Sequence, residues 1–353
     1  MRVTSTLLPA LGLAAGSASA AYVLEDDYSP DTFFQKFSFF TDRDPTNGFV
    51  DYVDRSTAES RGLISTGSSI YMGVDHTNVA SSGRQSVRLS STQTYHHGLF
   101  IIDLGHMPTG CGTWPAFWLL GPNWPNGGEV DIIENVNEAT SNHMALHTSD
   151  GCSINSSGFS GTLLTSNCYV QAPGQANNAG CGIQATSPNS YGSGFNSAGG
   201  GVYATEWTGD DISIWFFPRS SIPGDISSGN PNPSSWGTPA ARFAGNCDIE
   251  SHFTDMQIIF DVTFCGDWAG NVWGSSSCSA HGSCQDYVAN NPSAFAEAYW
   301  DINSLRVYRD SASVKKRAPD AGTTSTPGAV TGPRARGFPR RSMRARAWAP
   351  ELI

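Results

Sequence analysis

The chain has 353 residues, 39% of them hydrophobic, and its 10 Trp, 11 Tyr and 18 Phe supply enough bulk for a folded core, which excludes disorder throughout. This length allows one large β or α/β domain with appendages, or two smaller domains. The net charge of −11 is unevenly spread, because residues 21–310 hold 10 basic and 29 acidic side chains, a balance that argues against nucleic acid and anionic lipid as partners.

The first twenty residues match a secretory signal peptide. Arg2 precedes an apolar stretch from Leu7 to Ala15, and the small residues Ala18, Ser19 and Ala20 follow it. Later in the chain, no segment approaches the roughly 20 apolar residues that a membrane span needs. We therefore expect a secreted, extracellular protein with no membrane partner.

Residues 21–310 contain many short apolar or alternating runs, separated by stretches rich in Gly, Ser, Asn and Pro. The predicted strands cover residues 99–104, 116–120, 130–133, 143–148, 202–207, 212–217, 256–264 and 302–308. Such a pattern indicates an all-β sandwich or jelly roll. One short helix is predicted near the end, with Asn291 as N-cap, Pro292 at the first position and residues 294–299 continuing it. Without a repeat or a break in composition, residues 21–310 are predicted to form one domain.

Eight cysteines lie in this segment, and their even number after a signal peptide predicts up to four disulfides. They are Cys111, Cys152, Cys168, Cys181, Cys247, Cys265, Cys278 and Cys284. If all are paired, 105 connectivities are possible, and the spacing selects none of them. No CxxC pair occurs, so the cysteines do not indicate a zinc site.

Three carboxylates, Glu129, Asp131 and Glu134, interrupt an otherwise apolar predicted strand. In a regular strand Glu129 and Asp131 share one face, whereas Glu134 points to the other. A β-bulge between Asp131 and Glu134 would return Glu134 to the first face. All three acids would then line one surface, with Val130 and one of the two isoleucines packed behind.

Carboxylates this close repel one another, so at least one should hold its proton to a raised pH. Cleavage of a glycosidic bond needs that combination of a protonated acid and an ionised partner. The alternative is a calcium site or a solvated acidic strand. Trp114, Trp118 and Trp124 precede the acids and favour a sugar site, although each Trp taken singly is more often a core residue.

Residues 311–353 differ sharply from the rest of the chain. They hold nine basic and two acidic side chains and are rich in Pro, Gly, Arg and Ala, which predicts a basic, disordered tail. Within it, residues 315–317 read Lys-Lys-Arg, either a processing site or a solvated charge run.

At this point the chain resembles glycoside hydrolase family 16, and within it the secreted fungal endo-β-1,3(4)-glucanases called laminarinases. The resemblance covers nearly all of residues 21–310. It is carried by GCGTWPA at 110–116, WPNGGEVDIIE at 124–134, LHT at 146–148, FCGDWAG at 264–270, NPSAF at 291–295 and AYWDI at 298–302.

The resemblance implies a concanavalin A-like β-sandwich jelly roll with a long open substrate cleft and a retaining mechanism. It assigns Glu129 as nucleophile, Glu134 as general acid and later base, and Asp131 as a hydrogen-bonding neighbour of Glu129. Retention requires carboxyl groups about 5 to 5.5 Å apart, against about 6.5 to 9.5 Å for inversion. Sequence spacing alone does not separate the two, so retention rests on the resemblance. Asn135 stands where relatives often have Gly, and it can replace Gly in a left-handed conformation.

The same resemblance suggests four substrate-contacting residues, Trp118, Trp124, His147 and Trp268. We expect no cofactor and no metal. His143 and His147 form an HxxxH pair, but Met144 stands where a metalloprotease has Glu. A core histidine remains the alternative for His147.

The leading hypothesis is therefore a monomeric, secreted endo-glucanase whose partner is a β-1,3 or mixed β-1,3/1,4 glucan. A noncatalytic glucan-binding jelly roll and a cell-wall transglycosylase of the same fold are the alternatives. Other hydrolase and nucleotide chemistries lack support, because the chain has no GxSxG elbow and no GxxxxGK loop.

Overall fold

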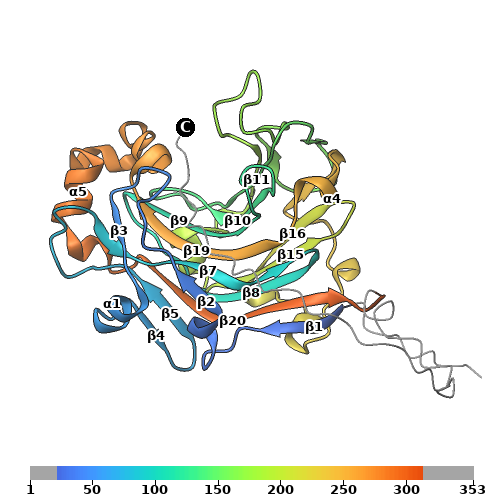
Figure 1. Cartoon of the computed structure of the whole chain (residues 1–353), viewed down its shortest axis with the longest axis horizontal. Helices are drawn as coiled ribbons and strands as arrows, with labels where there is room; N and C mark the ends of the chain where they lie inside the picture. The colour runs from blue at the N-terminus through green and yellow to red at the C-terminus, as the bar shows by residue number, and fades with distance from the viewer. Residues whose placement is uncertain (1–21, 313–353) are drawn as a thin grey trace, which may run out of the picture. The chain divides into compact units, whose positions relative to one another are not determined.

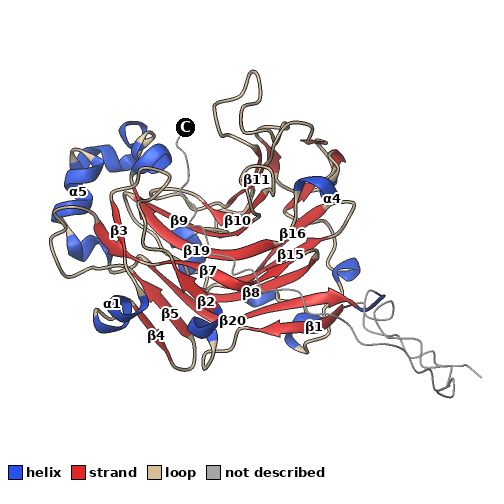
Figure 2. Ribbon diagram, in the orientation of Figure 1, coloured by secondary structure: helices blue, strands red, loops and turns tan. Residues whose placement is uncertain are grey.

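The computed structural model describes residues 22–312, which form two large antiparallel sheets packed on one another (Figure 1). Helical segments lie at the periphery of these sheets (Figure 2). The predicted leader, and the predicted tail apart from residues 311 and 312, lie outside the described residues. Among the described residues, no helix is long and apolar enough to cross a membrane.

The first sheet has eight strands, seven of them in one path. Their order is β17 (Ala241–Phe243), β16 (Ile212–Pro218), β15 (Gly201–Trp207), β8 (Gly98–His106), β20 (Tyr299–Asp310), β5 (Ile70–Gly73) and β4 (Ile64–Thr66), and β1 (Tyr22–Asp27) also pairs with β20.

The second sheet also has eight strands, and the strand with Glu129, Asp131 and Glu134 lies near its centre. Their order is β13 (Thr162–Leu163), β14 (Cys181–Gln184), β11 (His143–His147), β10 (Glu129–Glu134), β9 (Thr113–Leu120), β19 (Met256–Phe264), β7 (Arg88–Tyr95) and β2 (Phe37–Phe39).

Smaller elements complete the described chain. Two short pairs join β12 (Ser153–Ile154) to β18 (Gly245–Asn246) and β3 (Val50–Tyr52) to β6 (Arg84–Ser86). The α-helices are α1 (Arg55–Ser60), α2 (Gly192–Ser197), α3 (Gly224–Ser227), α4 (Ile249–His252) and α5 (Cys284–Asn290). The 3-10 turns are η1 (Phe33–Lys36), η2 (Arg219–Ser221), η3 (Pro233–Ser235), η5 (Trp273–Ser275), η6 (Ser277–His281) and η7 (Pro292–Phe295), and η4 (Gly266–Gly270) is a π-turn.

The core lies between the two sheets, and the strand sequences show how it is filled. Along β8, Phe100 and Ile102 join the main buried cluster, whereas Leu99 and Ile101 belong to a separate cluster on the outer face. This alternation follows from the two-residue period of a strand. Each predicted strand is confirmed, apart from Thr148, which follows the end of β11. The all-β jelly-roll prediction is therefore confirmed.

The predicted helix near residue 291 is wrong in extent. Only the single turn η7 forms, and Tyr299 already begins β20, where it pairs with Gly73 of β5. The side chain of Asn291 donates backwards to the Tyr287 carbonyl, 2.9 Å away, at the end of α5, rather than capping η7. Pairing within the sheet outweighs the local helix signal, because it buries Trp300 and Ile302.

All eight cysteines are paired, as the sequence allowed. The disulfides join Cys111 to Cys278, Cys152 to Cys247, Cys168 to Cys181 and Cys265 to Cys284. Cys111 precedes β9 and Cys265 follows β19, whereas their partners lie in η6 and α5. Two disulfides therefore fasten the helical segment after β19 to the ends of two central strands.

Candidate active site

The predicted bulge is present in β10. Glu129 pairs with His147 and Asp131 with Ala145, but Glu134 pairs with His143, one position later than a regular ladder would give. The extra residue returns Glu134 to the face that holds the other two acids. Both isoleucines of the bulge, 132 and 133, are fully buried in the core between the sheets, which corrects the expectation that only one packs there.

Asn142 satisfies the backbone groups that the bulge leaves without ladder partners. The Glu134 N–H donates to Asn142 Oδ1 at 2.9 Å, and Asn142 Nδ2 donates to the Ile132 carbonyl at 2.8 Å. The Asn142 N–H in turn donates to Ser190 Oγ at 2.9 Å. Because Asn142 is fully buried, water cannot replace these bonds, and its side chain fixes the bulge.

At the Glu129 end of β10, His147 lies between two carboxylates. Its Nε2 is 3.3 Å from Asp131 Oδ2 and 3.9 Å from Glu129 Oε1, and its Nδ1 is 3.0 Å from Asn178 Oδ1. Burial alone would lower the pKa of His147, but the Asp131 hydrogen bond and the charges of all three acids raise it to about 10. The ring thus lies between two carboxylates that favour its cationic form.

Opposing effects act on the pKa of the Glu129 carboxyl group. Burial, then the charge of Asp131, raises its pKa to about 8. The charges of His147 and Arg88 and a hydrogen bond from the Trp124 side chain act in the other direction. These three groups favour the ionised carboxylate.

Besides His147 and Asp131, a second buried ion pair lies on the face of the sheet that carries the acids. Arg88 Nη1 of β7 is 3.8 Å from Asp261 Oδ2 of β19, and the guanidinium lies 5.1 Å from the centre of the Trp118 ring. Burial raises the pKa of Asp261 to about 7, although Arg88 opposes the shift. The pair lies on the same face as the acids, since Asp261 pairs with Ala116 and Ala116 with Glu134.

At the Glu134 end the two nearest side-chain partners, Trp114 and His143, are neutral. Trp114 Nε1 donates to Glu134 Oε1 at 2.7 Å, and His143 Nδ1 lies 4.0 Å from Glu134 Oε2. Burial lowers the pKa of His143 to about 4. Burial, then the charge of Asp131, raises the pKa of Glu134 well above its ordinary value. Glu134 is therefore suited to keep a proton.

The predicted substrate-contacting aromatics lie around this row of acids. Trp124 precedes the Glu129 end and is 44% exposed. Trp118, opposite Asp131 in the ladder, is only 8% exposed and forms part of the sheet surface. Trp268 in η4 packs edge-on against Trp114 and His143, with ring centres 5.6 and 5.4 Å apart. Indole rings thus lie near both ends of the row. The open cleft remains a prediction.

Asn135 does not adopt the left-handed conformation expected for it; Asn137 does, with φ of 56°. Instead, the Asn135 side chain accepts from the Val136 N–H at 2.8 Å and donates to the Ser141 carbonyl at 2.9 Å. Asn137 Oδ1 accepts from the Gly112 N–H at 2.8 Å. The turn after Glu134 is therefore held by two asparagine side chains.

The sequence does not assign four neighbours of the acids to the site: Arg88, Asn142, His143 and Asp261. It gives Trp114 only as one of three tryptophans that favour a sugar site. Trp114 and His143 could have been predicted from the two-residue period of a strand. Trp114 is four residues before Trp118 and His143 is four before His147, so each shares a face with a predicted contact. Arg88 and Asp261 come from strands that only the sheet order brings together. Asn142 had no signal, because its role depends on the bulge.

Among the described residues, two groups of side chains outside the disulfides place their ligand atoms close enough together to hold a metal ion. One is Glu129, Asp131 and His147, and the other is His96, His97 and Glu250. In the first group the three acids favour the protonated form of the His147 ring, and that form offers no lone pair at Nε2. The arrangement instead provides ionised and protonated carboxyl groups on one face, which is the requirement of glycosidic bond cleavage.

Comparison with known families agrees with this chemistry. Residues 37–308 match the XgeA-like catalytic domains of glycoside hydrolase family 16. The chain belongs to this family, and it is a glycoside hydrolase.

Curated relatives cover most of the chain. An endo-1,3(4)-beta-glucanase of Arthroderma benhamiae is 51% identical over 317 residues, which is 88% of this chain and 69% of the relative. A probable glycosidase of Schizosaccharomyces pombe is 52% identical, over 82% of this chain and 69% of the relative. A probable endo-1,3(4)-beta-glucanase of Aspergillus niger is 48% identical over 87% of this chain, which spans only 43% of that relative.

Two solved structures are similar in both fold and sequence. Laminarinase 16A from Phanerochaete chrysosporium, with 6-O-glucosyl-laminaritriose in its donor and acceptor sites, is 48% identical with a TM-score of 0.78, over 82% of this chain and 99% of that one. An elongating family 16 beta-1,3-glucosyltransferase is 50% identical with a TM-score of 0.77, over 82% of this chain and all of the other.

Proposed function

We propose that this chain is a retaining endo-β-glucanase that cleaves internal bonds of β-1,3 or mixed β-1,3/1,4 glucans. The observation that carries the proposal is the unequal pair of glutamates on one face of β10. Glu129 lies beside the cationic His147, whereas Glu134 lies beside the neutral Trp114 and His143. The two carboxyl groups are thus suited to different roles.

In the first step the Glu129 carboxylate attacks the anomeric carbon and forms a glycosyl ester. The bond from that carbon to the leaving oxygen breaks, and Glu134 gives its proton to this oxygen. Proton loss leaves Glu134 ionised. His147 favours the ionised form of Glu129 against the effect of burial, and Asp131 holds His147 in place through their 3.3 Å contact.

In the second step the roles at Glu134 reverse. Its carboxylate takes a proton from water while the water oxygen attacks the anomeric carbon, and the ester bond to Glu129 breaks. The β configuration is restored and both carboxyl groups return to their starting states. Trp114, which donates to Glu134 at 2.7 Å, serves both stages, because its N–H can bond to either form of the carboxyl group.

Aromatic side chains at both ends of the row supply sugar-binding surfaces. Trp124 is the most exposed of the three predicted tryptophans, so its face is available to a pyranose ring. Trp268 lies beside the Glu134 end. A neutral glucan also suits the acidic domain of net charge −19, which would repel an anionic polymer. The four disulfides support secretion of the protein, and we expect a monomer.

Transglycosylation is a second candidate, favoured by the 50% identity to an elongating β-1,3-glucosyltransferase. The first step is the same, but the hydroxyl group of another glucan replaces water in the second. Glu134 would take the proton from that hydroxyl group. The two activities therefore differ in which acceptor reaches the ester first, not in the catalytic residues.

Product analysis tests the proposal. Laminarin, lichenan and a β-1,4 glucan are digested, and the products are resolved by mass and linkage. We expect internal cleavage of laminarin, lichenan or both. Chains longer than the starting oligosaccharides would assign transglycosylation, whereas binding without any product would support the noncatalytic alternative. Cleavage confined to the β-1,4 glucan would contradict the proposal.

A further inference from the structure

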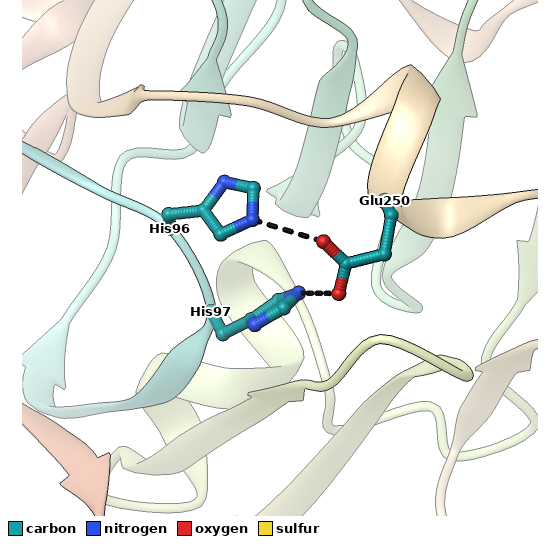
Figure 3. A group of neighbouring side chains, drawn as sticks. All are labelled: His96, His97 and Glu250. Atoms are coloured by element: carbon teal, nitrogen blue, oxygen red, sulfur yellow. Dashed lines mark hydrogen bonds and ion pairs between the residues drawn. The ribbon is translucent and has the colours of Figure 1, made fainter. Parts of the chain in front are cut away.

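Two consecutive histidines and a glutamate converge where the chain passes from the second sheet to the first. His96 and His97 form the connection between β7 and β8, and Glu250 lies on the short helix α4 (Figure 3). His96 Nε2 is 3.1 Å from Glu250 Oε2, and His97 Nε2 is 2.9 Å from Glu250 Oε1. This cluster is separate from the acids of β10.

The backbone is bent so that both rings reach one carboxylate. Consecutive side chains of an extended chain point in opposite directions, but His97 adopts a left-handed φ of 66°. The two rings consequently lie on the same side, with centres 4.5 Å apart (Figure 3). Such a conformation is uncommon for a residue other than Gly, so the convergence is a specific feature of this turn.

Hydrogen bonding does not account fully for the arrangement. His97 Nε2 is buried, yet it has no aligned hydrogen-bond partner among the described residues, despite its short distance to Glu250. If both rings were protonated, two cations would face a single carboxylate. Neutral rings around one cation would satisfy all three side chains.

We propose that His96, His97 and Glu250 bind a divalent transition metal ion of the zinc type. Their ligand atoms lie within 4.8 Å of one another, so small side-chain adjustments bring each to the roughly 2.0 to 2.2 Å that zinc requires. Two imidazoles and one carboxylate suit zinc, whereas calcium takes mainly oxygen ligands. Water completes the fourth position, on the exposed side.

The metal would link the connection between β7 and β8 to α4. This helix and the residues after it contact the loops that precede β10 and follow β11. After α4, the Thr254 N–H donates to the Gly127 carbonyl at 3.2 Å, in the loop that leads to Glu129. Within α4, His252 Nε2 is 3.1 Å from the Asp150 carbonyl, in the loop after β11. Binding at Glu250 therefore stabilises the folded domain on the side of these two loops.

Zinc titration of the full chain, freed of metal with a chelator, tests this site. The Glu129→Gln background removes one ligand of the other candidate group, so binding there is suppressed. We expect one equivalent of Zn²⁺ by calorimetry, the visible absorption of tetrahedral Co²⁺ on cobalt substitution, and a Tm rise of several degrees at saturation. Ca²⁺ should give no such rise.

Three variants locate the site. His97→Asn keeps a residue that tolerates the left-handed conformation, and we expect at least about tenfold weaker zinc binding. Glu250→Gln should weaken binding similarly, whereas His76→Asn, at an exposed histidine outside the cluster, should not. Absence of zinc binding, or equal binding by all three variants, would overturn the proposal. Because the readout is metal affinity, these results do not depend on glucanase activity.

Discussion

The two ends of strand β10 carry the same residue type on the same face, but their surroundings differ. Glu129 has the cationic His147 at 3.9 Å, and Glu134 has the Trp114 N–H at 2.7 Å and His143 at 4.0 Å. The histidines are four residues apart on β11, yet the pKa is raised to about 10 for His147 and lowered to about 4 for His143.

This difference matches the two roles that we propose for Glu129 and Glu134. Burial lowers the pKa of both histidines, and only His147 has Asp131 close enough to outweigh it. Asp131 therefore acts on the pair through His147 as well as through its own charge. Burial raises the pKa of both glutamates, but the cationic His147 opposes that rise at Glu129, whereas the nearest partners of Glu134 are neutral.

The largest effect is expected from Glu129→Gln. An amide cannot form the glycosyl ester, so laminarin hydrolysis should fall at least about 10³-fold. Reducing-end release measures the loss. Glu138→Gln is the matched control, because Glu138 follows Glu134 by four residues and is exposed. Full activity of the Glu129 variant would refute the proposed role.

Replacement of His147 by Asn should reduce kcat/KM about 100-fold, the scale of one lost electrostatic contact. His147 lowers the pKa of Glu129, so its removal raises that pKa. Because Glu129 must be ionised, the acidic limb of the pH–rate profile should move to higher pH. His143→Asn should cause a much smaller loss and leave this limb in place. Equal effects of the two variants would abolish the distinction between the ends.

Asn142→Ala tests the bulge that places Glu134 beside Glu129. The substitution leaves the Ile132 carbonyl and the Glu134 N–H buried without these partners, which should cost about 1 to 3 kcal/mol of unfolding free energy. We also expect kcat to fall more than KM changes, since the acid is misplaced. Denaturant unfolding and steady-state kinetics measure both, with the exposed Asn189→Ala as control. A stable, fully active variant would show that the bulge does not need Asn142.

The smallest effect concerns pH and stability. The pKa of Glu134 in the folded chain lies above its ordinary 4.5. The folded state is therefore not penalised by this group below pH 4.5, and its free energy of unfolding falls as the pH rises above that value. Glu134→Gln removes that loss and can still accept from Trp114. Its Tm should equal that of the wild type near pH 4 and exceed it by a few degrees at pH 8. A constant Tm difference would argue against a raised pKa.

Much of the fold and of the site could be predicted from local sequence, and the features that could not be predicted depend on contacts between distant residues. The apolar runs predict the eight confirmed strands, and the spacing of Glu129, Asp131 and Glu134 predicts the bulge. The end of the helix at Phe295 depends on pairing between β20 and β5, which lie far apart in the sequence. Likewise, Arg88 meets Asp261 only because β7 lies next to β19.

The division of labour between Glu129 and Glu134 is tested most directly with an aryl β-laminaribioside whose leaving group needs no protonation. We predict that Glu134→Gln still releases the aryl group in a rapid first step, whereas Glu129→Gln does not. Laminarin, whose leaving group needs protonation, should be left intact by both variants. The account would be contradicted if Glu129→Gln released the aryl group and Glu134→Gln failed to do so.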